Sequence, residues 1–217
     1  MNPFALILSS PSGGGKTTLT RLLLERRDDV GYSISCTTRK PRLGETDGVD
    51  YHFLTREEFL ARRLRGDFAE SADVFGNLYG TLRQEVEMVF SSQRHVVMDI
   101  DVQGALQFLA AFPESVPVFL LPPSADVLLS RLKSRNTESA EIVRQRLTAA
   151  RDELRAVVRY DYVVINDDLE RAYRQVAAIV DAETVRHSRL PGLEERVEGL
   201  ISELDRQISS NLTVGRS

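Results

Sequence analysis

A short segment near the start of the chain constrains its fold more than any other feature. Residues 4–8 form an apolar run of the kind found in buried strands, and the glycine-rich turn Ser10–Gly15 follows almost at once. Lys16 and Thr17 come next, and leucines then recur at helical spacing. In a strand, turn and helix of this order, backbone N–H groups converge on phosphate oxygens and the helix N-terminus adds positive potential. The segment therefore predicts a polyphosphate site within an α/β fold.

The same segment fits the P-loop pattern GxxxxGK[ST], except that Ser10 stands at the first glycine position. This substitution is compatible with the loop if Ser10 does not need a positive φ. The pattern predicts that Lys16 reaches the β and γ phosphates and that the Thr17 hydroxyl faces Mg²⁺. A glycine-rich hairpin or linker is the plainer interpretation. The strand before the turn, the amphipathic helix after it and the placement of one of only three lysines favour a nucleotide phosphate site.

Further apolar runs alternate with stretches of helical spacing along the chain. Strands that alternate with helices are typical of a parallel sheet with helices on both faces, so we expect an α/β domain with five parallel strands. The strands expected after the first are Tyr32–Ser35, His95–Ile100, Val116–Leu121 and Tyr162–Ile165.

Two segments depart from this alternation. Residues 35–84 are rich in Gly, Thr, Arg and Asp, and we interpret them as an insertion with its own small sheet. Thr55 and Glu58 have the spacing of a capping box, which predicts a helix that begins there. The charged stretch within about 131–147 lies between two helices and suits a mobile flap.

Composition narrows the classes of function. The 217 residues carry 28 Lys and Arg against 32 Asp and Glu, a formal net charge of −4, which argues against non-specific binding to nucleic acid or to a membrane. The single cysteine, Cys36, excludes an internal disulfide, and three histidines do not make a structural zinc cluster. The chain has no signal-peptide pattern and no apolar stretch near the roughly 20 residues of a membrane span. We therefore expect a cytoplasmic protein with neither nucleic-acid nor membrane partners.

Further motifs follow the P-loop in order. Arg39 and Arg42 stand three residues apart with a proline between them, and with Tyr51 they could bind one phosphate. The other motifs are Gly76-Asn-Leu-Tyr-Gly-Thr, Asp99-Ile-Asp-Val-Gln-Gly and Ile165-Asn-Asp-Asp. Together these motifs resemble the guanylate kinase family over about residues 4–186. Several motifs in the right order are more specific than any one of them alone.

The resemblance implies a five-stranded parallel-sheet P-loop kinase core flanked by helices, with an inserted small α+β domain for GMP and a mobile lid. It also implies Mg²⁺-dependent transfer of the γ-phosphoryl group of ATP to GMP or dGMP, in purine nucleotide metabolism. By the same resemblance, the core spans 1–34 and 85–190 with the lid within about 131–147, the GMP-binding insertion spans 35–84, and the C-terminal helix spans 191–217.

Positions that match the family's motifs imply the site residues. For ATP they are Ser12, Gly13, Gly14, Gly15, Lys16, Thr17, Thr18 and Asn166. For GMP they are Ser35, Arg39, Arg42, Tyr51, Glu70, Tyr79, Thr81 and Asp101. For the metal ion they are Thr17 and Asp99, and Asp99 could exchange roles with Asp101 because both lie on one side of a strand end. For catalysis they are Lys16, Arg131, Arg135 and Arg146, whose charges would neutralise the transferred phosphoryl group.

The residue chemistry agrees with guanine as the base. A carboxylate such as Glu70 accepts hydrogen bonds from N1 and N2 of guanine, while the Ser35 and Thr81 hydroxyls can donate to O6. Adenine lacks that donor pair, and leaving Glu70 unpaired in a desolvated pocket costs about 1 to 3 kcal/mol. Taken singly, these residues have plainer interpretations as surface charges or core aromatics; the ordered set favours function.

Five positions differ from the family pattern. They are Ser10 in the P-loop, Cys36 where many members have a hydroxyl, Ser71 where an aromatic residue is usual, Leu78 in place of the first tyrosine of Tyr-Tyr-Gly, and Asn136 where glycine is frequent. We expect these differences to affect packing around the base and flexibility of the flap more than the identity of the base.

Other functions stay open at this point. A catalytically inactive guanylate kinase-like module could bind a protein partner, but such modules lack a working P-loop, which this chain has. A related kinase could act on a ribose phosphate, but Ser35, Glu70 and Thr81 favour guanine. The final helix has one apolar side, which would pack on its own domain, the arrangement that we favour, or on another copy, so a homo-oligomer is compatible with the sequence.

Overall fold

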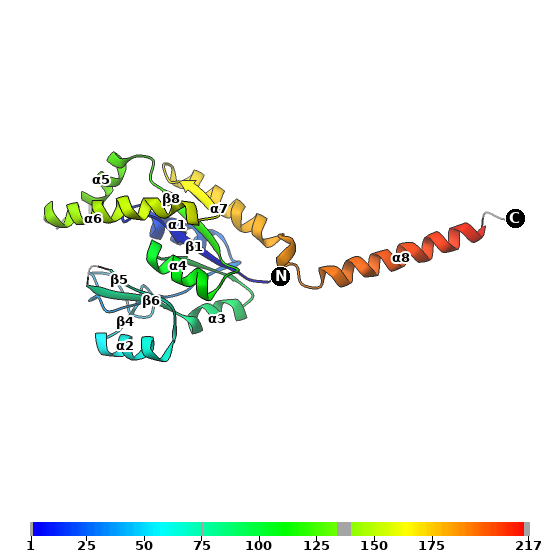
Figure 1. Ribbon diagram of the computed structural model, residues 1–217, viewed down its shortest axis with the longest axis horizontal. Helices are drawn as coiled ribbons and strands as arrows, with labels where there is room; N and C mark the ends of the chain where they lie inside the picture. Colours follow the sequence, from blue (N-terminus) through cyan, green and yellow to red (C-terminus); the bar gives the residue numbers. More distant parts are fainter. Residues whose placement is uncertain (1, 75, 134–139, 215–217) are drawn as a thin grey trace.

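The computed structural model describes residues 2–74, 76–133 and 140–214, and these form a two-lobed body from which one long helix projects (Figure 1). The larger lobe is built on a five-stranded sheet in the order β2-β7-β1-β8-β9, and every pairing in it is parallel. The predicted α/β fold with five parallel strands is therefore confirmed. The strands are β1 (Ala5–Ser9), β2 (Val30–Tyr32), β7 (His95–Asp99), β8 (Val116–Leu121) and β9 (Tyr162–Ile165).

Helices cover both faces of this sheet. They are α1 (Lys16–Arg26), α3 (Arg83–Ser91), α4 (Val102–Ala111), α5 (Ala125–Lys133), α6 (Ala140–Leu154) and α7 (Leu169–Thr184), with 3₁₀ turns at Arg155–Arg159 and His187–Arg189. Leu6 and Leu8 of β1 pack with α1 and α7, whereas Ala5 and Ile7 pack with α3 and α4. Because side chains alternate between the two faces of a strand, β1 is buried along its whole length.

A second, smaller sheet forms within residues 35–84, in the order β4-β3-β6-β5. Its elements are β3 (Cys36–Thr37), β4 (His52–Phe53), α2 (Arg56–Arg65), β5 (Phe68–Val74) and β6 (Asn77–Leu82). Cys36 and Leu78, which differ from the family pattern, are both buried in the core of this sheet. The predicted capping box is confirmed, because the Thr55 hydroxyl accepts from the N–H of Glu58 and the Glu58 carboxylate accepts from the N–H of Thr55.

The last helix, α8 (Leu193–Val214), points away from the body (Figure 1). Leu193 is partly buried, and the side chains from there to Ser210 are exposed. The favoured expectation that this helix packs on its own domain is therefore wrong. Pro191 and Gly192 form a turn after the last 3₁₀ turn, and the helix leaves from the surface at that point. No helix within the described ranges is long and apolar enough to cross a membrane.

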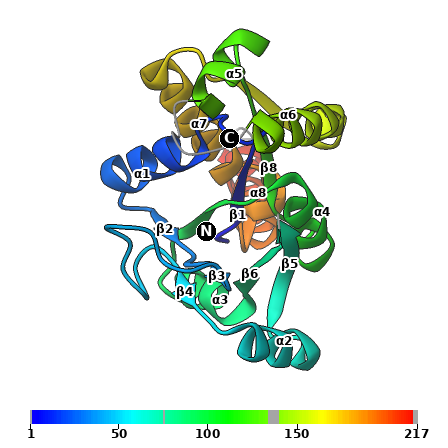
Figure 2. The same ribbon diagram turned by 90° about the vertical axis from the view of Figure 1, so that its left-hand side faces the viewer.

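The base of α8 lies beside the start of β1, because the N–H of Asn2 donates to the carbonyl of Arg189 at 3.2 Å. Strand β1 then runs away from α8, so the carboxyl end of the sheet faces the opposite end of the body (Figure 1). Figure 2 shows α5 and α6 at one end of that face and α2 at the other. Arg135 and Asn136, in the predicted flap, lie outside the described residues.

Candidate active site

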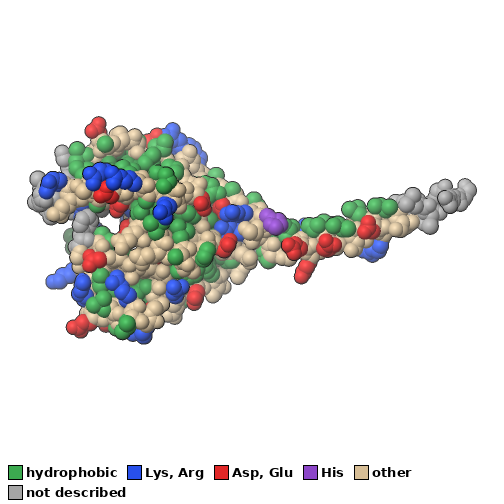
Figure 3. Space-filling view, viewed as in Figure 1, with side chains coloured by type: hydrophobic (Ala, Val, Ile, Leu, Met, Phe, Trp, Pro, Cys, Tyr) green, Lys and Arg blue, Asp and Glu red, His purple; other side chains and the backbone are tan. Residues whose placement is uncertain are grey.

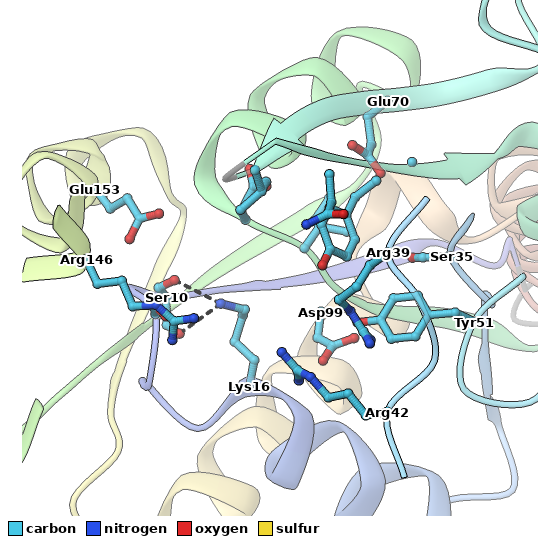
Figure 4. Close-up of a pocket in the computed structure, with 17 residues that line it drawn as sticks. Ser10, Lys16, Ser35, Arg39, Arg42, Tyr51, Glu70, Asp99, Arg146 and Glu153 are labelled. Carbon is cyan, nitrogen blue, oxygen red and sulfur yellow. Dashed lines mark hydrogen bonds between the residues drawn. The ribbon is translucent and has the colours of Figure 1, made fainter. Parts of the chain in front are cut away.

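A cavity of about 310 Å³ lies where the ends of β1 and β7 face the smaller sheet (Figure 4). It brings together many of the predicted site residues, namely Ser12, Lys16, Ser35, Arg39, Arg42, Tyr51, Glu70, Tyr79, Asp99, Asp101 and Arg146. Other predicted residues do not line it, namely Gly13, Gly14, Gly15, Thr17, Thr18, Thr81, Arg131 and Asn166. Two of these residues contact the lining: Thr17 bonds Asp99, and Thr81 bonds Glu70.

The glycine-rich loop turns sharply between β1 and α1. Gly13 and Gly15 adopt φ values of +86° and +94°, a region that favours glycine. Position 14 requires glycine for another reason, because a Cβ there would lie only 2.3 Å from Oγ of Ser10. Ser10 itself does not have a positive φ, so the condition for serine at this position is met. The loop therefore keeps the backbone path that a phosphate cradle requires.

Asn166, after β9, braces this loop. Its buried amide donates to the carbonyl of Gly14 at 2.8 Å, and a Cβ on Gly15 would lie 2.3 Å from the same amide nitrogen. Arg131 in turn donates to the carbonyl of Asn166 at 3.2 Å. Two predicted site residues thus support the loop from outside the cavity: Asn166 bonds the loop directly, and Arg131 bonds Asn166. An adenine contact of Asn166 stays a prediction.

Lys16 extends from the first turn of α1 into the cavity (Figure 4). Its Nζ donates to the carbonyl of Ser10 at 2.9 Å and lies 3.3 Å from Oγ of the same serine. The ammonium is therefore held over the loop.

Oxygen donors suited to Mg²⁺ meet beside the loop. The Thr17 hydroxyl donates to one carboxylate oxygen of Asp99 at 2.7 Å, and the Tyr32 hydroxyl donates to the other at 2.9 Å. Among the described residues no group of three or more metal-ligating side chains occurs. Mg²⁺ is often held by one or two protein oxygens together with phosphates and waters, so Thr17 and Asp99 fit an ion that arrives with a nucleotide. Tyr32 was missed in the sequence because it ends a separate strand.

On the side of the cavity opposite Lys16, the lining consists of two arginines and two tyrosines, Arg39, Arg42, Tyr51 and Tyr79. Both terminal nitrogens of Arg39 donate to the carboxylate of Glu45 at 2.9 Å, and the N–H of Arg42 donates to the same carboxylate at 2.7 Å. This Arg39 guanidinium lowers the pKa of Glu45, and it also lies 5.3 Å from the ring centre of Tyr51. Burial raises the pKa of the Tyr51 hydroxyl to about 12, so it stays a hydrogen-bond donor. Tyr79 meets the Tyr51 ring edge-on at 6.1 Å.

Glu45 was also missed in the sequence. The signal was a carboxylate three residues after Arg42 in a loop otherwise rich in cations. In this structure Glu45 takes the bidentate position on Arg39 that a phosphate could take.

Glu70 differs from Glu45 because it is buried and, within the part of the chain that the structure describes, no cation is bonded to it. Its side chain is in strand β5 directly across from Thr81 in β6, and the Thr81 hydroxyl donates to it at 2.8 Å. Burial raises the pKa of Glu70 to about 7; the Thr81 hydrogen bond opposes this shift and the charge of Asp101 adds to it. The carboxylate lines the same cavity as Lys16.

Gly104 is what allows α4 to approach this carboxylate. Asp101 caps α4 by accepting from the N–H of Gly104 at 2.8 Å, and a Cβ on Gly104 would lie 2.7 Å from Oε2 of Glu70. Gly104 is the last residue of the motif Asp99-Ile-Asp-Val-Gln-Gly, but the motif alone gives no reason for a glycine there. Its role depends on the position of Glu70, which lies far from it along the chain.

Helix α6 presents Arg146 and Glu153 to the cavity (Figure 4). The two residues are seven apart, two helical turns, and so share one face. Burial raises the pKa of Glu153, and the positive charge of Lys16 opposes this shift. The spacing from Arg146 was the signal in the sequence that could have identified Glu153.

Comparisons with known proteins agree with this arrangement. The guanylate kinase family model matches residues 3–183. A curated guanylate kinase of Chelativorans sp. (strain BNC1) is 49% identical over 199 residues, which cover 91% of each chain. One of Clostridium perfringens (strain 13 / Type A) is 47% identical over 134 residues, a match that spans 62% of each chain. The crystal structure of guanylate kinase from Anaplasma phagocytophilum is 35% identical, with a TM-score of 0.76 over 91% of this chain and 94% of that one.

Proposed function

Because the chain belongs to the guanylate kinase family, we propose that it transfers the γ-phosphoryl group of ATP to GMP or dGMP, giving ADP and GDP or dGDP. One observation carries this proposal. A single cavity holds Lys16 over a phosphate loop on one side and the buried carboxylate of Glu70 on the other. A kinase that transfers a phosphoryl group from one nucleotide to another needs both, one for the polyphosphate of the donor and one for the base of the acceptor.

Glu70 selects the base in this proposal. An ionised carboxylate accepts from N1 and N2 of guanine, whereas adenine offers no such pair of donors at that edge. The Thr81 hydrogen bond fixes Glu70 in one orientation, which supports selection by geometry. Ser35 also lines the cavity, and its hydroxyl is available for O6.

Arg39, Arg42 and Tyr51 bind the phosphate of GMP. All three line the cavity, and the planar guanidinium of Arg39 already makes a bidentate pair with a carboxylate. A phosphate would replace Glu45 there, because it offers the same paired oxygens with more negative charge.

Phosphoryl transfer depends on alignment and on neutralising charge, with little covalent help from the protein. Lys16 holds the β and γ phosphates, and Arg146 faces the transferred group from α6. Thr17 and Asp99 would hold Mg²⁺, which supplies further neutralisation of phosphate charge when it is bound. Arg131 supports the loop through Asn166, and a catalytic role for Arg135 stays a prediction.

Gly104→Ala should weaken GMP binding by about 10-fold or more, because the new Cβ would push Glu70 out of position. The added Cβ meets the far end of a side chain and no backbone atom, so we expect the variant to stay folded. Calorimetric titration with GMP and with ATP measures the effect, alongside a melting curve. Gly199→Ala in α8 is the control, since a Cβ there meets no atom within 4 Å. Unchanged GMP affinity in Gly104→Ala would contradict this role for Glu70.

The proposed activity is tested by measuring ADP formation with ATP, Mg²⁺ and one acceptor at a time. We expect GMP and dGMP to be phosphorylated, with kcat/KM at least about 100-fold above that for AMP, UMP or ribose phosphates. Preference for a ribose phosphate would favour the related kinase. No ADP with any acceptor, in a folded preparation, would favour the inactive binding module.

A further inference from the structure

Helix α8 has an exposed apolar stripe, formed by Val197, Leu200, Leu204 and Ile208, which does not pack against the body. The helix has 22 residues and is therefore about 33 Å long. Val197, Leu200, Leu204 and Ile208 are 44% to 58% exposed, and Figure 3 shows hydrophobic side chains along one edge of the projecting helix. Isolated apolar residues on a surface are ordinary, but a continuous apolar stripe on a projecting helix marks an interaction surface.

The spacing of this stripe is that of a two-stranded coiled coil. Val197, Leu200 and Leu204 are separated by three and then four residues, the spacing of the inward positions of a heptad. Leu193, one step earlier in the same pattern, extends the seam, and Ile201 widens it. A second helix of the same kind would cover it.

The charges of α8 favour an antiparallel pair. The helix carries five acidic and two basic side chains, a net charge of −3, and acidic residues fill its first turn. A parallel pair would bring the two acidic first turns together, and it would also crowd two bodies at one end. An antiparallel pair places them at opposite ends. The net negative charge also disfavours an anionic membrane surface as the partner.

We propose that α8 is a self-association helix, which pairs antiparallel with α8 of a second copy of this chain. In the register that we propose, Val197 packs against Leu200 of the second copy, and Leu193 packs against Leu204 of the second copy. The same register places Arg196 beside Glu203 of the second copy, and the two-fold symmetry repeats each contact. The stripe and the flanking charges are thus both self-complementary.

The register has a further consequence at the ends of the pair. Ile208 of each copy reaches the base of the other helix, where Val185 and Leu190 are exposed at 68% and 38%. The cavity stays open, because it is lined by residues at the carboxyl ends of β1 and β7, and these strands run away from α8 (Figure 1). Association is therefore expected to leave turnover unchanged.

Sedimentation velocity of the full chain at micromolar concentrations tests the proposal. We expect a dimer, and Leu200→Glu should raise its dissociation constant by roughly 100-fold, because a charge replaces an apolar contact in the seam. Ser202→Glu adds the same charge on the opposite side of the helix and should leave the dimer intact. Wild-type chain that sediments as a monomer would overturn the proposal, as would a dimer that tolerates Leu200→Glu.

Charge exchange tests the register. Arg196→Glu and Glu203→Arg each place like charges beside one another, and each should weaken the dimer by about 10-fold. Mixing the two variants should restore wild-type affinity as a one-to-one heterodimer, since each copy then meets the opposite charge. The rescue also shows that both variants are folded. A mixture no tighter than either variant alone would overturn the antiparallel register.

Discussion

Lys16→Ala is expected to lower kcat by about 10³-fold while the affinity for GMP stays nearly unchanged. The ammonium lies over the glycine-rich loop, where it donates to the carbonyl of Ser10, and among the described residues no other lysine lines the cavity. In the proposed reaction Lys16 stabilises negative charge on the ATP phosphates, and this charge shifts towards the leaving ADP oxygen during transfer. The proposed GMP site lies on the smaller sheet and does not include Lys16. Steady-state kinetics together with calorimetric titration of GMP separate the two effects.

Lys40→Ala is the matched control for this experiment. Lys40 is exposed, and Arg39 contacts only its backbone carbonyl, at 2.8 Å. Removing its side chain should therefore change kcat little. Wild-type turnover by Lys16→Ala, or an equal loss in Lys40→Ala, would reject the assignment of the phosphate loop.

The parts of the site that could be predicted are those whose geometry is local in the sequence. The order of strand, glycine-rich turn and helix was predicted because each step depends on neighbours within a few residues, and it puts Lys16 in the first turn of α1. The alternation of strands and helices likewise predicted the parallel sheet. The capping box of α2 needed only the spacing of Thr55 and Glu58.

Residues whose roles depend on distant partners were missed. Tyr32 bonds Asp99 because β2 lies beside β7, and Gly104 is needed because α4 packs against β5 at Glu70. Neither neighbour could be inferred before strand order was known. For α8, the pattern predicted an amphipathic helix, but not that its apolar side would face away from the chain's own core.

Two carboxylates have opposite properties: Glu70 lines the cavity, whereas Glu45 is bonded to Arg39, which lines it. Arg39 lowers the pKa of Glu45, so that residue remains ionised at neutral pH. Burial raises the pKa of Glu70 from an ordinary 4.5 to about 7, so at neutral pH it is divided between its neutral and ionised forms. An ionised Glu70 is the better acceptor for the two donors of guanine, so the KM for GMP should fall as the pH rises through about 7.

Glu70→Gln is expected to raise the KM for GMP by about 100-fold above pH 7 and, at the same pH, to increase stability. The folded protein binds a proton at Glu70 more tightly than the unfolded chain does. The wild type therefore loses stability as pH rises from about 4.5 to about 7, by up to roughly 3 kcal/mol at higher pH. Glutamine carries no charge, so the variant escapes that loss, while its amide NH₂ meets the guanine donors unfavourably.

Denaturant unfolding and GMP kinetics over this pH range measure both effects. Glu45→Gln is the control, because the pKa of Glu45 is lowered and its stability contribution is lost only as the pH falls below the ordinary range of a glutamate. The stability difference between this control and the wild type should therefore stay constant between about pH 5 and about pH 8. The stability difference between Glu70→Gln and the wild type should instead grow as the pH rises over the same range. A Glu70→Gln protein with unchanged KM for GMP, or with a stability difference that does not vary with pH, would mean that Glu70 is neither the base-reading group nor a buried acid of raised pKa.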